Sequence, residues 1–206
     1  MQEEKVQQHW MQSEVEKFML TFGQEVRFVP SVKRVSDQIR SLRLNLIREE
    51  LLETIVGFKN NDVVEFADGI ADSLYVVLGG GSAFGYNLDN GPDVVGGCVP
   101  TGMGVGYYLN VLSGHLEKMA IAVLWQSDFE CNRYLNKYFK VLGYICKEFN
   151  IPIDDIFKEV QASNMSKLGI DGRPIYREDG KVLKGPNYFK PDIKKFFPER
   201  IYITLL

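Results

Sequence analysis

Hydrophobic residues recur with a helical period along most of the chain, and this pattern predicts a predominantly helical protein. Val15, Phe18, Met19 and Phe22 illustrate the spacing, since they share one face of a helix. The expected helices lie at about 12–22, 36–58, 62–78, 108–125 and 130–149, and a shorter one follows Ile151.

Polar caps and glycines suggest where these helices begin and end. Ser36 and Asp62 are expected to cap the second and third helices, and the glycines at 79–81 are expected to end the third. The stretch 86–107 is rich in Gly and Pro and predicts a long loop. The tail after residue 168 has no helical period, and its "DG" and "GP" turn signals suggest an irregular or hairpin segment.

Length and charge indicate one ordinary globular domain over residues 1–206, with an insertion at about 88–149. The net charge of -3 gives no general attraction to nucleic acid or anionic lipid. The N-terminus is polar and no apolar run is long enough to span a membrane, so a soluble, cytoplasmic protein is expected. Cys98, Cys131 and Cys146 lack CxxC spacing and are interpreted as reduced thiols.

Two consecutive expected helices carry carboxylates among apolar residues. The stretch "LIREELLETIV" is followed by "VVEFADGIADSLYVVL", and in both the acids share an arc of the helix with apolar neighbours. The short connection between these helices makes them antiparallel neighbours, so their acidic stripes can face one another. The acids in question are Glu49, Glu50, Glu53, Glu65, Asp68 and Asp72.

A solvated face is the common reason for acids at helical spacing, but two features argue against it here. No Lys or Arg lies one turn from Glu50, Asp68 or Asp72 on its own helix, and apolar neighbours direct these faces inward. A di-iron site would need ExxH motifs, whereas His9 and His115 stand far from the acids. An all-oxygen site favours Mg²⁺, or Mn²⁺.

The two acid-bearing segments and their flanks resemble a known superfamily. "EELLE" followed by "EFADGIADSLYVVLG" is similar to the EExxE and ExxD pattern of the all-α nucleoside triphosphate pyrophosphohydrolases, which include MazG, dimeric dUTPases and phosphoribosyl-ATP pyrophosphohydrolase. The flanks "FMLTFGQEVRFVP" and "DDIFKEVQASNMSKLGIDGRPIYREDGKVLKGPNYFKPDI" resemble the MazG-like branch. The resemblance covers about 14–87 and 150–193, and it implies an all-α antiparallel bundle of the MazG-like type.

The resemblance implies Mg²⁺-dependent hydrolysis of a nucleoside triphosphate to the monophosphate and pyrophosphate. A deoxy or noncanonical nucleotide is the expected substrate. One residue departs from the family pattern, because the glutamate of ExxD falls on Gly69. Either Asp68 takes this role, or Glu65 and Asp68 form the motif with Asp72 as an additional ligand. A third alternative is that the missing glutamate weakens or abolishes activity.

Roles for the site residues follow from this chemistry and from the resemblance. The expected metal ligands are Glu50, Glu53, Asp68 and Asp72, with Glu65 as an additional ligand. Glu49 points about 100° away from Glu50 and is the candidate base that activates water. The expected substrate contacts are Asn164, Lys167 and Lys184.

The aromatic helices of the insertion predict a subunit interface, and the protein is expected to form a homodimer or homotetramer. Alternatively, these aromatic side chains stack on a nucleotide base or bind a partner protein. Two alternative functions are also compatible with the sequence. One is phosphoribosyl-ATP hydrolysis, and the other is a catalytically inactive bundle that binds nucleotides or a partner protein.

Overall fold

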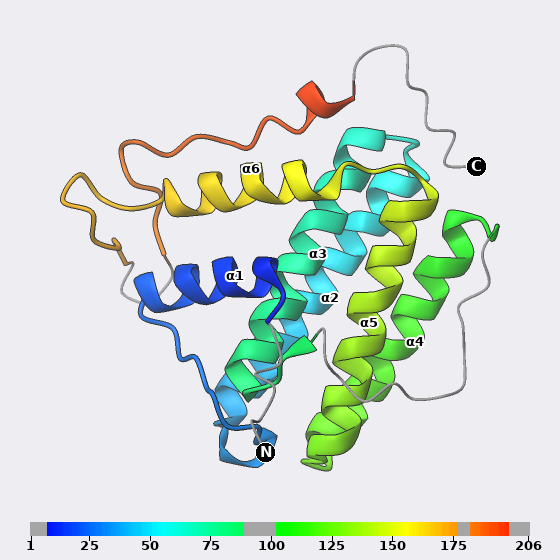
Figure 1. Ribbon diagram of the computed structural model, residues 1–206, viewed down its shortest axis with the longest axis vertical. Coiled ribbons are helices and arrows are strands. Elements are labelled where there is room, and N and C mark those ends of the chain that lie inside the picture. Colours follow the sequence, from blue (N-terminus) through cyan, green and yellow to red (C-terminus); the bar gives the residue numbers. More distant parts are fainter. Residues whose placement is uncertain (1–7, 89–101, 177–181, 198–206) are drawn as a thin grey trace, which may run out of the picture.

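The computed structural model describes residues 8–88, 102–176 and 182–197, and these residues are almost entirely helical (Figure 1). Their only paired extended residues are Tyr176 and Val182, which form an isolated antiparallel bridge in the tail. The elements are α1 (Trp10–Thr21), η1 (Val32–Arg34), α2 (Asp37–Lys59), α3 (Val63–Phe84), α4 (Val105–Leu124), α5 (Asp128–Glu148), α6 (Ile153–Met165) and η3 (Lys194–Phe196). The all-α fold class is confirmed.

Helix α3 lies at the centre of the molecule. It packs most extensively against α2, and it also contacts α1, α5 and α6. Helices α2 to α5 run alongside one another, and α1 and α6 lie across them (Figure 1). Almost every residue of the C-terminal half of α3 is buried, which explains why "SLYVVLGGGSAF" is so apolar. The two acid-bearing helices α2 and α3 are therefore direct neighbours, as the sequence predicts.

Helices α4 and α5 fall within the predicted insertion at 88–149, and they contribute to the core of the bundle. Their fully buried side chains include Leu112 and Tyr138. Helix α4 packs against α2, and helix α5 packs against α3. Most of the predicted loop at 86–107, including Cys98, lies outside the described residues. The division into one domain with an insertion stays a prediction.

Local signals in the sequence correctly placed the starts of α2 and α3. The Ser36 hydroxyl accepts a hydrogen bond from the Ile39 amide at 3.3 Å. The Asp62 carboxylate accepts from the amides of Val64 and Glu65, each at 3.0 Å. These bonds satisfy amides that have no partner within the helix, so both cap predictions are confirmed.

The prediction that the glycines at 79–81 end the third helix is wrong. Helix α3 continues through them to Phe84 and ends at Gly85, whose φ of 81° is left-handed. The reason is tertiary packing, because the glycines are buried where other groups approach the helix closely. A Cβ at Gly79 would lie 3.0 Å from Nη1 of Arg43, and one at Gly81 would lie 2.8 Å from Cγ of Leu88. Close packing here outweighs the intrinsic cost of glycine in a helix, which is about 1 kcal/mol relative to Ala.

Gly69, the position that departs from the family pattern, faces α2 at a close crossing of the two helices. A Cβ at this position would lie 2.7 Å from Oγ1 of Thr54 and 2.9 Å from its Cα. A matching approach occurs at Gly57, where a Cβ would lie 2.6 Å from the amide nitrogen of Phe66. A glutamate at position 69 would collide with α2 rather than join the acids, so Gly69 has a structural role in this chain.

The close crossing predicts a clear stability difference between two glycine substitutions. Gly69→Ala should lower the free energy of unfolding by about 1–3 kcal/mol, because the added methyl group overpacks the contact with Thr54. Gly143→Ala is the control, since position 143 of α5 is exposed with no neighbouring atom within 4 Å of its Cβ position. This control should gain about 0.5–1 kcal/mol from helix propensity. Urea denaturation measures the free energy of unfolding of both variants. Equal changes in the two variants would contradict the close crossing of α2 and α3 at Gly69.

Among the described residues, no helix combines the length and hydropathy that crossing a membrane requires.

Candidate active site

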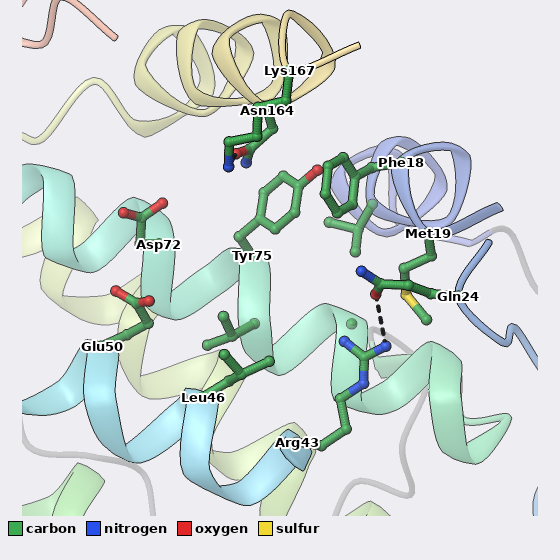
Figure 2. Close-up of a pocket in the computed structure, with 13 residues that line it drawn as sticks. Phe18, Met19, Gln24, Arg43, Leu46, Glu50, Asp72, Tyr75, Asn164 and Lys167 are labelled. Atoms are coloured by element: carbon green, nitrogen blue, oxygen red, sulfur yellow. Dashed lines mark hydrogen bonds between the residues drawn. The ribbon is translucent and has the colours of Figure 1, made fainter. Parts of the chain in front are cut away.

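The acidic faces of α2 and α3 open into a pocket of about 280 Å³ that α1 and the end of α6 also line (Figure 2). Four of the predicted site residues line it: Glu50 from α2, Asp72 from α3, and Asn164 and Lys167 from α6 and its C-terminal end. In Figure 2, Asn164 at the end of α6 and Lys167 just beyond this helix lie above Asp72. The structure thus brings together residues that are far apart in sequence and were predicted to act together.

A second pocket of about 200 Å³ adjoins the first and shares Asp72, Asn164 and Lys167 with it. It adds Asp68, which is half-buried like Glu50, Asp72 and Lys167. It also adds Lys190 from the tail. The two adjoining pockets are therefore lined by carboxylates of α2 and α3 and by the cations Lys167 and Lys190.

The carboxylates are held in an unfavourable environment for negative charge. Oε2 of Glu50 and Oδ1 of Asp68 are buried and have no hydrogen-bond partner. Burial, reinforced by Glu53 and Glu49, raises the pKa of Glu50 to about 7. Burial also raises the pKa of Asp72 well above its ordinary value, and the neighbouring Glu50 adds to the shift. Desolvation and like-charge repulsion thus act together on this cluster.

Asp68 shows the same behaviour, because burial and then the nearby Glu65 raise its pKa. Glu65 itself is exposed, as are Glu49 and Glu53. These three carboxylates line neither pocket, although Glu53 is close enough to raise the pKa of each of the more buried acids. The observed placement favours Asp68 over Glu65 as the inner acid of the ExxD region, while their roles stay predictions.

The carboxylates fit a hard divalent cation in chemistry and in electrostatics. Buried oxygens without hydrogen-bond donors, repelling one another, are the groups that such a cation stabilises. In the described part of the chain, no group of three or more His, Cys, Asp or Glu side chains is already arranged to hold a metal. The ligand assignment therefore stays a prediction.

Lys167 lies between the two pockets and faces the acids. Its Nζ donates to Oδ1 of Asn164 at 2.7 Å. Burial lowers the pKa of Lys167, and the negative charge of Asp72 opposes this shift. The amide of Gly185 donates to the Lys167 carbonyl at 3.0 Å. Any side chain at position 185 would collide with the Leu168 carbonyl, so a glycine is required for the tail to dock here.

The serines of "SNMSK" fix the tail against α6. The Ser163 hydroxyl donates to the Phe189 carbonyl at 2.8 Å, and the Phe189 amide donates to the Ser166 hydroxyl at 3.2 Å. These bonds hold the following residue, Lys190, at the second pocket. Lys190 was missed in the sequence, because nothing in an aperiodic tail shows which residue will face the acids.

Lys184 is the third predicted substrate contact. It is exposed and lines neither pocket, and its Nζ lies 4.3 Å from the ring centroid of Tyr188, which does line the second pocket. Lys184 therefore lies at the edge of the site, and its contact with phosphate stays a prediction. Sequence reasoning also missed Arg43 and Gln24, which line the first pocket.

The described residues thus form an all-helical fold with an acidic pocket that Lys167 also lines. Residues 15–94 match the family model described as phosphoribosyl-ATP pyrophosphohydrolase. This family belongs to the MazG-like nucleoside triphosphate pyrophosphohydrolase superfamily, so the resemblance predicted from the sequence is confirmed. The matched segment contains α2, α3 and all of their acids.

A curated relative matches part of the chain. The chain is 41% identical over 78 residues to "Uncharacterized protein L479" of Acanthamoeba polyphaga mimivirus, and this match covers 37% of the chain and 31% of the relative. The chain thus spans less than a third of that protein. No solved structure matches the chain significantly.

Proposed function

We propose that the chain hydrolyses a nucleoside triphosphate, deoxy or noncanonical, to the nucleoside monophosphate and pyrophosphate with Mg²⁺ or Mn²⁺. One observation supports this most. Glu50 and Asp68 each have a buried carboxylate oxygen without a hydrogen-bond partner, and they lie with Asp72 in adjoining pockets that Lys167 also lines. The carboxylates would be stabilised by a cation, and Lys167 would be stabilised by an anion. A metal-bound triphosphate supplies both charges.

In this proposal the ligands of Mg²⁺ are Glu50, Glu53, Asp68 and Asp72, with Glu65 as an additional ligand. The bound ion would supply positive charge that offsets the charge developing on the phosphate oxygens. The exposed Glu49 accepts a proton from the attacking water. The water oxygen bonds to the α-phosphorus as the α–β phosphoanhydride bond breaks, and pyrophosphate leaves with the bonding electrons.

The wall opposite the acids holds the phosphate chain. Lys167 and Lys190 donate to its oxygens, and Asn164 hydrogen-bonds to a phosphate or to the sugar. We also propose a homodimer or homotetramer, because large side chains such as Leu52, Val56 and Trp125 are exposed on the bundle. Light scattering on the purified protein measures its mass.

The family match favours a second candidate substrate, phosphoribosyl-ATP, which carries the same triphosphate. A panel experiment compares it with canonical and modified nucleoside triphosphates in Mg²⁺ and in Mn²⁺. Chromatography should detect equal amounts of monophosphate and pyrophosphate. Hydrolysis of phosphoribosyl-ATP alone would favour the second candidate, and binding without any product would favour an inactive nucleotide-binding bundle.

The two tail lysines predict unequal effects on substrate binding. Lys190→Ala should raise the KM for the triphosphate about threefold to fivefold, as expected for a partly solvated charge that contributes up to about 1 kcal/mol. Lys184→Ala should have a smaller effect, because Lys184 lines neither pocket. Steady-state kinetics compares the variants, and a larger effect of Lys184→Ala would place the phosphates nearer to Lys184 than to Lys190.

A further inference from the structure

The first pocket has a second polar end, formed by Arg43 and Gln24 (Figure 2). Arg43 precedes Glu50 by about two turns of α2, or roughly 10 Å along the helix axis. Figure 2 shows the guanidinium and the Gln24 amide on the side of the pocket away from Glu50 and Asp72. Neither residue has a role in the proposed hydrolysis.

The Arg43 guanidinium is buried without a charged partner. The residue is 7% exposed, and burial lowers its pKa to about 10, so it remains charged at neutral pH. Its Nη2 donates to Oε1 of Gln24 at 3.0 Å, and its Nε has no hydrogen-bond partner. Within the described ranges no carboxylate forms an ion pair with it. Gly79 leaves the space that the guanidinium occupies.

The pair presents hydrogen-bond donors to the pocket. A guanidinium has no acceptor, so Gln24 must use its oxygen for Arg43, which leaves its NH₂ group free to donate. A ligand that completes this end must therefore supply acceptors. Between this end and the acids, the pocket walls are apolar and suit a flat ring; they include Val15, Phe18, Leu46, Tyr75 and Val76.

We propose that Arg43 and Gln24 bind the base of the substrate and select a base with adjacent acceptors, such as O6 and N7 of guanine or hypoxanthine. The inference rests on the proposed function, since the acids at the other end fix where the phosphates lie. A guanidinium pairs well with O6 and N7, whereas adenine places an NH₂ donor at the position of O6. The apolar walls then bury the base, and the few polar groups fix its orientation and provide specificity.

The test compares guanine, hypoxanthine and adenine nucleotides in the parent and in Arg43→Gln and Gln24→Leu. Two readouts are used, kcat/KM for the deoxynucleoside triphosphates and the Kd of their non-hydrolysable α,β-methylene analogues by calorimetry with Mg²⁺. Arg40→Gln is the matched control. Arg40 is also a buried arginine of α2, but it donates to the Val32 carbonyl and pairs with Asp37 outside this pocket.

The parent should prefer guanine and hypoxanthine to adenine by about tenfold or more, and both pocket variants should reduce this ratio to below about threefold. Arg40→Gln should keep the parental ratio even if it lowers stability. Binding of the analogues measures the ratio whether or not the triphosphates are hydrolysed, which separates this inference from the proposed function. A parent without base preference, or equal weakening of all bases in Arg43→Gln, would overturn the inference, and the latter would assign Arg43 to a phosphate.

Discussion

Asp72→Asn should reduce turnover of the triphosphate at least about 100-fold, equivalent to about 3 kcal/mol of transition-state stabilisation. Asp72 lines both adjoining pockets, so its carboxylate lies where the acids of α2 and α3 meet Lys167. Asparagine keeps the shape of the side chain and removes its charge. The loss therefore reports metal binding and not a change in packing.

The same substitution should raise the melting temperature of the metal-free protein. Burial and Glu50 raise the pKa of Asp72, which means that the ionised carboxylate destabilises the folded state at neutral pH. A neutral side chain removes this repulsion. Mg²⁺ should stabilise the parent strongly and the variant much less.

Glu117→Gln is a suitable control, because Glu117 is an exposed acid of α4 that lines neither pocket. It should keep parental turnover and the parental response of the melting temperature to Mg²⁺. Equal Mg²⁺-induced shifts in the parent and in Asp72→Asn would mean that Asp72 does not bind the metal.

Lys167→Ala should weaken triphosphate binding about 30-fold, since a hydrogen bond from a charged donor in a partly buried site contributes about 2 kcal/mol. Lys167 lines both pockets, and burial already lowers its pKa, so its ammonium group lacks the hydration that it would have in water. The phosphate oxygens replace this hydration. Calorimetry with a non-hydrolysable triphosphate measures the loss.

Lys158→Ala on the same helix is the matched control. Lys158 is exposed, pairs with Asp155 at 3.2 Å and lines neither of the adjoining pockets, so its removal should leave nucleotide affinity unchanged. Binding of Mg²⁺ without nucleotide should stay close to parental in both variants. If Lys167→Ala leaves nucleotide affinity unchanged, the phosphates lie elsewhere and a protein-binding role gains support.

Local signals predicted the helices well because the deciding interactions are local. Ser36 and Asp62 accept hydrogen bonds from amides within the next three residues. The segments with a helical period of apolar residues form helices in the structure. The glycines at 79–81 were misread because their surroundings come from distant segments. Arg43 and Leu88 approach the helix there, and no pattern within α3 reveals this.

The acids of the site could be predicted because they lie on two helices joined by a short turn. The opposite wall could be predicted only in part. Asn164 and Lys167 were found through the resemblance, whereas Lys190 depends on how the tail docks onto Ser163 and Ser166. Arg43 gave no signal, because a lone arginine in a helix is ordinary until its burial is known.

The most direct test of the central claim is a product analysis by ³¹P NMR on the parent protein with a deoxynucleoside triphosphate, with Mg²⁺ and with EDTA, alongside Asp72→Asn. The account predicts nucleoside monophosphate and pyrophosphate in equal amounts with Mg²⁺. It predicts neither product above background with EDTA or in Asp72→Asn. Release of orthophosphate and nucleoside diphosphate instead, or equal turnover in Asp72→Asn and the parent, would contradict it.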